Sequence, residues 1–176
     1  MAKELSLWTI GHSTLAIEDL IDRLKAFRIE TLVDVRSYPG SRRYPQFNKE
    51  NLRDSLTNAG VSYLHLPELG GRRKTRADSL NLAWRNESFR GYADYMETQE
   101  FRAGIERLRE IAGEGATAIM CSEAVWWRCH RSLISDYLKV QGIEVIHIMT
   151  AAKSEVHPFT SAAKIVDGEL SYRGIL

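Results

Sequence analysis

Apolar residues recur along the chain with two spacings, one typical of buried strands and one typical of amphipathic helices. Short β-prone runs predict five strands, over residues 5–11, 31–35, 61–66, 116–120 and 143–148. Apolar positions three and four residues apart predict helices between them, over residues 17–27, 48–60, 89–96, 101–113 and 131–142. Near the C-terminus, the residues on either side of Asp167-Gly168 predict a small hairpin.

The alternation of strands and helices predicts an α/β fold. It favours a mostly parallel sheet of about five strands, with helices on both faces, in a single three-layer domain over residues 1–176. The expected fold is Rossmann-like, but no Gly-x-Gly-x-x-Gly follows the first strand and no Walker loop is present. We therefore expect no cofactor, and neither a dinucleotide-dependent dehydrogenase nor an ATP-driven enzyme.

Composition indicates the cellular compartment of the protein but does not identify a binding partner. The net charge of +1 gives the chain no overall field that would draw it to nucleic acid or to a membrane. The sequence has no long apolar run and no charged-then-apolar leader, and two cysteines make a weak case for a disulfide. We therefore expect a reduced, cytoplasmic protein without a membrane partner.

Polar side chains stand where the predicted strands end. They are His12, Ser13, Asp34, Arg36, Cys121 and Glu123. Ligands of parallel α/β sheets bind beyond the carboxyl ends of the strands, so we expect these side chains to meet in one substrate site.

Residues 120–131 hold both cysteines and concentrate reactive groups. Cys129, His130 and Arg131 lie at the predicted start of a helix, where backbone N–H groups favour anions. Guanidinium groups match the geometry of phosphate. We therefore expect Arg36 and Arg131, together with the first turn of this helix, to bind an anionic group, with Ser13 as a further donor.

Several of these residues have two interpretations. His12, Asp34 and Glu123 are candidate general acids and bases, but the carboxylates would equally suit ion pairs with nearby arginines. Cys121 is a candidate nucleophile if neighbouring cations lower its pKa, and otherwise a small buried residue. Seven residues separate Cys121 from Cys129, which is not the spacing of a zinc knuckle, so we expect no metal site.

Residues 67–86 show no clear period and predict a long loop. Arg72, Arg73 and Trp84 make this segment basic and aromatic, as surfaces that bind single-stranded nucleic acid are. A solvated loop would have the same composition, and both interpretations stay open.

Taken together, these motifs resemble the uncharacterised family called domain of unknown function 488. The motifs are Thr9-Ile10-Gly11-His12-Ser13, Asp34-Val35-Arg36, Leu69-Gly70-Gly71, Cys121-x-Glu123 and Cys129-His130-Arg131. They extend over nearly the whole chain. The resemblance implies an α/β fold and no established reaction.

The leading hypothesis is an enzyme, either a hydrolase or a group transferase. Its substrate would be a small phosphorylated or nucleotide-like molecule bound at the carboxyl edge of the sheet. The first alternative is a nucleic-acid-binding module without chemistry, and the second is a metal-assisted hydrolase.

Overall fold

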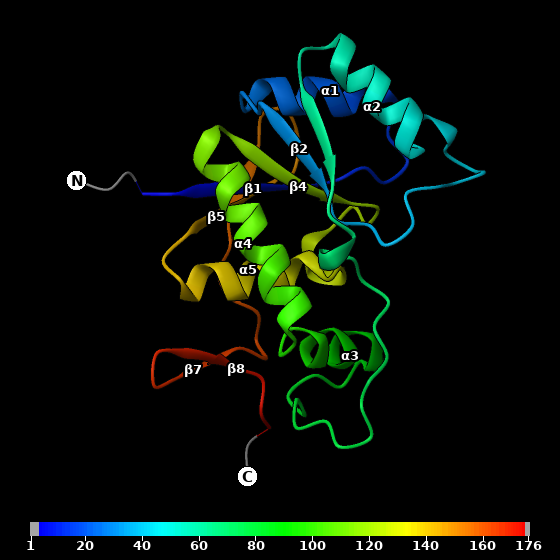
Figure 1. The fold of residues 1–176 in the computed structure, drawn as a ribbon. Helices are drawn as coiled ribbons and strands as arrows, with labels where there is room; N and C mark the ends of the chain where they lie inside the picture. The colour runs from blue at the N-terminus through cyan, green and yellow to red at the C-terminus, as the bar shows by residue number, and fades with distance from the viewer. Residues whose placement is uncertain (1–3, 175–176) are drawn as a thin grey trace.

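The computed structural model describes residues 4–174, in which a six-stranded sheet lies between two layers of helices (Figure 1). The strands are β1 (Ser6–Gly11), β2 (Thr31–Asp34), β3 (Ser62–His65), β4 (Thr117–Cys121), β5 (Glu144–Ile148) and β6 (Ser154–Val156). Their order is β3-β2-β4-β1-β5-β6, and all neighbours are parallel except β5 and β6. The predicted α/β fold with a mostly parallel sheet is confirmed.

The sixth strand is the one element of this sheet that the hydrophobic pattern did not predict. β6 has only three residues, all of them exposed, so it has no apolar alternation to detect. The hairpin near the C-terminus is confirmed, and it consists of β7 (Lys164–Val166) and β8 (Glu169–Ser171). Asp167 and Gly168 have φ angles of 52° and 80°, as the two central residues of a type I′ turn require.

Helices cover both faces of the sheet. On one face lie α1 (Ile17–Ala26) and α2 (Lys49–Asn58), and on the other lie α3 (Glu87–Tyr95), α4 (Gln99–Glu114) and α5 (Arg131–Val140). Figure 1 shows the first pair above the strands, α3 and α5 below them, and α4 in front of them. Single turns of 3₁₀ helix span Pro45–Phe47, Pro67–Leu69 and Trp126–Arg128.

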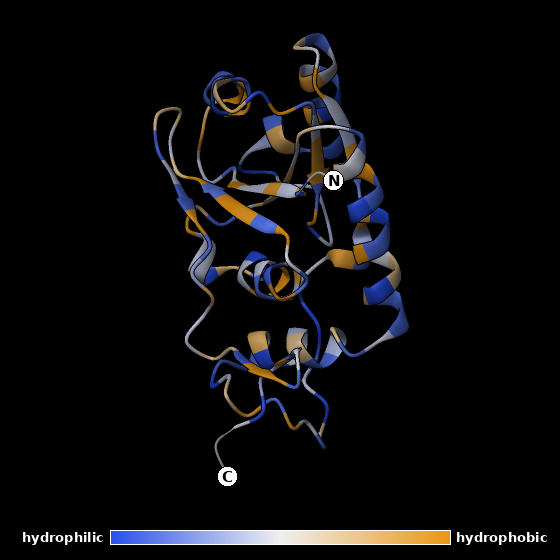
Figure 2. Ribbon diagram, turned by 90° about the vertical axis from the view of Figure 1, so that its left-hand side faces the viewer, coloured by the Kyte–Doolittle hydropathy of each residue, from blue (hydrophilic) through white to orange (hydrophobic). Residues whose placement is uncertain are grey.

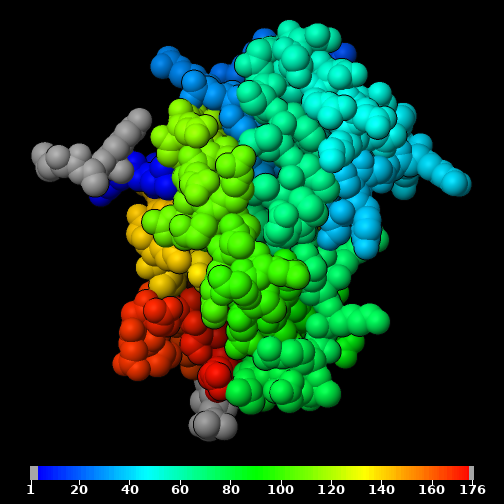
Figure 3. Space-filling model, viewed as in Figure 1, coloured from blue at the N-terminus to red at the C-terminus, as the bar shows by residue number. Residues whose placement is uncertain are grey.

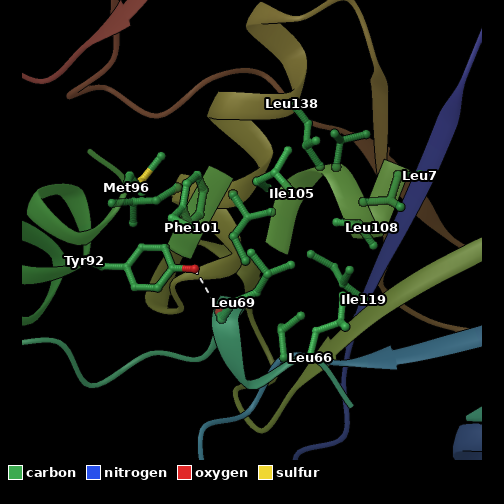
Figure 4. Close-up of a cluster of buried hydrophobic side chains, with 14 of the residues drawn as sticks. Leu7, Leu66, Leu69, Tyr92, Met96, Phe101, Ile105, Leu108, Ile119 and Leu138 are labelled. Atoms are coloured by element: carbon green, nitrogen blue, oxygen red, sulfur yellow. Dashed lines mark hydrogen bonds between the residues drawn. The ribbon is translucent and has the colours of Figure 1, made fainter. Parts of the chain in front are cut away.

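The core is divided into two clusters because neighbouring residues of a strand point to opposite faces. Val33 and Ile119 pack in the cluster under α3–α5, whereas Leu32 and Met120 pack in the cluster under α1 and α2. Figure 4 shows part of the first cluster. In Figure 2 the helices carry both hydrophobic and hydrophilic positions, as expected when only one face of each is buried.

The register of the sheet brings the carboxyl ends of β1, β2 and β4 to the same edge. Gly11 pairs with Cys121, and Asp34 pairs with Met120. The segment that follows β2 continues from this edge and lies at the surface, at the right of Figure 3. The residues directly after these three strands are therefore neighbours in space.

Candidate functional site

A cavity of about 640 Å³ opens at this carboxyl edge. Seven of the nine residues that we assigned to catalysis or anion binding line it. They are His12, Ser13, Arg36, Cys121, Glu123, Cys129 and His130. The other two, Asp34 and Arg131, are buried behind its wall.

Asp34 holds Arg36 in place. The Asp34 carboxylate accepts from Nε and Nη2 of Arg36 at 2.9 and 2.7 Å, and from the hydroxyl of Tyr63 at 2.6 Å. Arg36 Nη2 also donates to the carbonyl of Phe47. Since the carboxylate is fully buried and its acceptors are occupied, the structure places Asp34 as a positioning residue. Its predicted role as an acid or base in direct contact with substrate does not fit this position.

His12 is held as a neutral imidazole in the cavity wall. Its Nδ1 donates to the carbonyl of Ser13 at 2.9 Å, and its Nε2 lies 3.4 Å from Nη1 of Arg36, which can only donate. The ring stacks on Phe47 with centroids 4.2 Å apart. Burial lowers the pKa of His12, and the positive charge of Arg36 lowers it further. Nε2 is therefore unprotonated near neutral pH and faces the Arg36 donor.

Gly11 allows the loop after β4 to pass close to the end of β1. A Cβ atom at Gly11 would collide with the carbonyl oxygen of Glu123. The backbone N–H groups of His12 and Ser13 donate to the carbonyls of Cys121 and Ser122, which fixes the same contact. The side chain of Glu123 is left exposed at the cavity, where its carboxylate has no hydrogen-bond partner among residues 4–174.

Arg131 does not reach the cavity as we expected. Its side chain is 1% exposed, and its guanidinium donates to the carbonyl of Glu123 at 2.7 Å and to Oγ1 of Thr9 at 3.2 Å. Its Nε has no partner in the part of the chain that the structure describes. The positive charge of the guanidinium acts to lower the pKa of both Cys121 and Cys129.

The first backbone N–H groups of α5 are bonded to acceptors within the protein, one of which is a sulfur atom. The N–H of Arg131 donates to Sγ of Cys129 at 3.4 Å, and the N–H groups of Ser132 and Leu133 donate to the carbonyls of Cys129 and His130. These amides are thus already bonded. An anion in the cavity would have to be bound by side chains, contrary to our expectation for this helix.

The two cysteines of the site are in different electrostatic environments. Burial raises the pKa of Cys121, and the neighbouring Cys129 adds to the effect. Burial also acts to raise the pKa of Cys129, but a hydrogen bond from Cys121 and the charges of His130 and Arg131 outweigh it, so that the pKa of Cys129 is lowered. The sequence singled out Cys121 as the reactive thiol, whereas the structure places the favourable contacts around Cys129.

Arg72 and Arg128 also line the cavity, and both are exposed. The guanidinium group of neither residue forms a hydrogen bond or an ion pair with any residue in the range 4–174. Arg72 was predicted to belong to a nucleic-acid surface, and Arg128 was not among the predicted site residues. The sequence feature that could have identified Arg128 is its position in the same loop as the Cys-His-Arg motif.

The rest of the predicted basic and aromatic surface is built into the fold. Arg73 stacks on Tyr95 at 3.7 Å and donates to the carbonyls of Gly70 and Pro67. Trp84 is half-buried, with its ring edge-on to Phe89 and Tyr172. Neither side chain lines the cavity, so a role in binding nucleic acid remains a prediction without support from their positions.

The described residues contain no group of three or more histidine, cysteine, aspartate or glutamate side chains arranged to hold a metal ion. Nor does the range 4–174 contain a helix with the length and apolar character needed to cross a membrane.

Comparisons with known proteins assign the chain to a family. Its residues 16–138, about 70% of the sequence, match the family model described as domain of unknown function DUF488. No curated protein and no solved structure matches the chain. Because this match covers more than half of the sequence, the chain belongs to the DUF488 family.

Proposed function

We propose that the protein is an enzyme, a hydrolase or group transferase, whose small phosphorylated or nucleotide-like substrate binds in the cavity at the carboxyl edge of the sheet. The observation that carries the proposal is the pair of unpartnered guanidinium groups, Arg72 and Arg128, that line one cavity from two separate segments. Glu123 is the only carboxylate among the described lining residues, so the lining has an excess of positive charge. Such a surface favours an anion.

Other lining groups suit the remaining parts of a phosphorylated substrate. Hydroxyl groups of several serines, Ser13, Ser88 and Ser122 among them, line the cavity and could donate to phosphate oxygens. Tyr38 is 76% exposed and lies at the cavity with Phe89. An aromatic ring that is not packed in the core is suited to stack on a planar base.

The same cavity contains groups that can transfer protons. The exposed carboxylate of Glu123 can accept a proton or orient a nucleophile, and the neutral ring of His12 lines the same cavity. Arg36, fixed by its two hydrogen bonds to Asp34, keeps Nη1 next to His12. Hydrolysis or group transfer needs this combination of anion binding and proton transfer.

A binding screen tests the proposal directly. Inorganic phosphate, nucleoside monophosphates and sugar phosphates are compared by thermal shift and titration calorimetry. A ligand at 100 times its Kd should stabilise the protein by about 2.7 kcal/mol. Loss of a charge-assisted contact costs roughly 1.5–3 kcal/mol. We therefore expect Arg72→Ala and Arg128→Ala each to weaken binding by roughly 10- to 100-fold.

Arg102→Ala is the matched control, because Arg102 is an exposed arginine of α4 that lies outside the cavity. It should leave affinity unchanged. Equal effects of all three substitutions would show that binding is non-specific and would contradict the proposal. Affinity that grows with oligonucleotide length and falls steeply with salt would contradict it in favour of a nucleic-acid-binding module.

A further inference from the structure

The wall of the cavity contains a sulfur atom, Sγ of Cys129, with donors and cations nearby. Sγ of Cys129 accepts the backbone N–H of Arg131 at 3.4 Å and lies 3.5 Å from Nδ1 of His130. The neighbouring Cys121 thiol and the positive charge of Arg131 both act to lower the pKa of Cys129. Cys129 also lies at the N-terminus of α5, where the helix dipole favours a negative charge.

The hydrogen bonds of His130 define how a proton can leave Cys129. Nε2 of His130 lies 2.9 Å from the carbonyl oxygen of Val35, which can only accept, so Nε2 carries a hydrogen. In the neutral ring Nδ1 is then an acceptor, and it faces the Cys129 thiol. Transfer of the thiol proton to Nδ1 produces a thiolate and an imidazolium in direct contact.

The surroundings favour this charged pair. The imidazolium would keep its bond to Val35, and the thiolate would keep three donors. The fully buried Tyr92 has its ring 5.1 Å from His130, and its hydroxyl donates to the carbonyl of Leu69 (Figure 4). Burial acts to lower the pKa of His130, and the negative charge on Cys129 reverses this and raises it.

Arg131 is an independent observation that points to an anion at this place. Its guanidinium is 1% exposed, has an unpartnered Nε, and forms no ion pair with a carboxylate of residues 4–174. Buried cations are normally paired, because an isolated one is strongly destabilising. A negative charge on the nearby sulfur of Cys129 would supply the missing charge.

We propose that Cys129, with His130 as its proton acceptor, is the nucleophile of this site. This step rests on the proposed phosphorylated substrate. Sγ attacks phosphorus, the sulfur–phosphorus bond forms, and the bond to the leaving oxygen breaks as that oxygen takes the proton from Nδ1 of His130. Water then attacks phosphorus and gives its proton to His130, so that phosphate and the Cys129 thiolate are released. Cys121 is a positioning residue that donates its S–H to the thiolate.

Alkylation of the intact protein by iodoacetamide, followed by mass spectrometry, tests the thiolate without knowledge of the substrate. We expect one modified residue, Cys129, with nearly the same rate at pH 6 and pH 8. An ordinary thiol, with a pKa of about 8.5, would react roughly 50- to 100-fold more slowly at the lower pH. Absence of labelling at Cys129, or the steep profile of an ordinary thiol, would overturn the proposal.

Ultraviolet absorbance of the thiolate gives a second readout that does not depend on reagent access. The signal should persist at pH 6, disappear in Cys129→Ser, and remain in Cys121→Ser, which keeps a donor. In Cys121→Ala and His130→Asn the titration midpoint should move to higher pH. A signal that is lost in Cys121→Ser but kept in Cys129→Ser would assign the thiolate to Cys121 and would refute our assignment.

Orthovanadate tests the step at phosphorus, because it accepts a nucleophile as a phosphoryl group does. It should slow alkylation of Cys129 at saturating concentration, and an unchanged rate would refute the phosphoryl step. The two proposals can fail separately. A thiolate at Cys129 without binding of any phosphorylated ligand would refute the proposed function alone, whereas binding without a thiolate would refute the nucleophile alone.

Discussion

Acidification should destabilise the fold through His147, which is buried in a continuous hydrogen-bonded network. Its Nδ1 lies 2.6 Å from Oγ1 of Thr9, and its Nε2 lies 2.9 Å from Nδ1 of His157. The indole of Trp126 stacks on the ring with centroids 4.6 Å apart. Burial, followed by the charges of His157 and Arg131, lowers the pKa of His147 to about 2. The network therefore requires a neutral ring.

The sign and size of the effect follow from the difference between the folded and unfolded states. In the unfolded chain His147 has the ordinary pKa of about 6.5, so below this pH the unfolded state binds a proton that the folded state excludes. Stability is therefore lost as the pH falls from about 6.5 towards about 2. The loss is about 1.4 kcal/mol per pH unit, or about 2.7 kcal/mol at a pH of about 4.5.

Urea unfolding at several pH values measures this loss, with His147→Gln as the variant that cannot titrate. The variant should be less stable near neutral pH, but the stability difference from the wild type should shrink by about 1.4 kcal/mol per unit between about pH 6 and pH 4. Gln141→Ala, an exposed change in the loop after α5, should give a constant offset. A constant offset for His147→Gln, or a His147 resonance that titrates above about pH 5, would refute the reasoning.

Three further predictions concern contacts in the protein interior, and each is measured by urea unfolding. Asp136→Leu removes the acceptor of four hydrogen bonds and should cost about 3–5 kcal/mol, whereas the exposed Asp78→Ala should change stability by less than about 0.5 kcal/mol. Gly11→Ala forces the Glu123 carbonyl to move and should cost roughly 1–3 kcal/mol; no loss would show that the loop yields freely. Tyr63→Phe removes a hydrogen bond to a buried carboxylate and should cost about 1.5–3 kcal/mol, and a neutral result would contradict the assigned contact.

Strands and their common edge could be predicted because both depend on local pattern. Buried runs such as Thr31–Asp34 are apolar enough to identify, and parallel pairing then places His12, Arg36 and Cys121 at one edge whatever their exact contacts. β6 was not predicted because its pairing with β5 depends on backbone contacts and not on side-chain burial. Sequence spacing can therefore predict which side chains share one edge of the sheet.

Contacts within the site depend on directions that spacing does not contain. Arg36 and Arg131 look equivalent in sequence, as arginines close to strand ends or helix starts. In the structure Arg36 is hydrogen bonded to Asp34 and lies at the cavity. Arg131 instead points inward to Thr9 and lies near the two cysteines. Likewise, the sequence pattern favoured Cys121, at a strand end, over Cys129, at a helix start, as the reactive thiol. The helix start is nevertheless the position that lowers a thiol pKa.

The surroundings of Arg131 also show why sulfur is better placed than a carboxylate to balance its charge. The closest acid in its network is Asp136, which is separated from Thr9 by two histidines, and whose oxygens already accept four hydrogen bonds. A direct ion pair would have satisfied Arg131 and left Cys129 an ordinary buried thiol. Without one, the guanidinium is stabilised when Cys129 loses its proton, and the thiolate is stabilised by the guanidinium in return. The absence of a carboxylate beside Arg131 in the described residues therefore favours an active thiol.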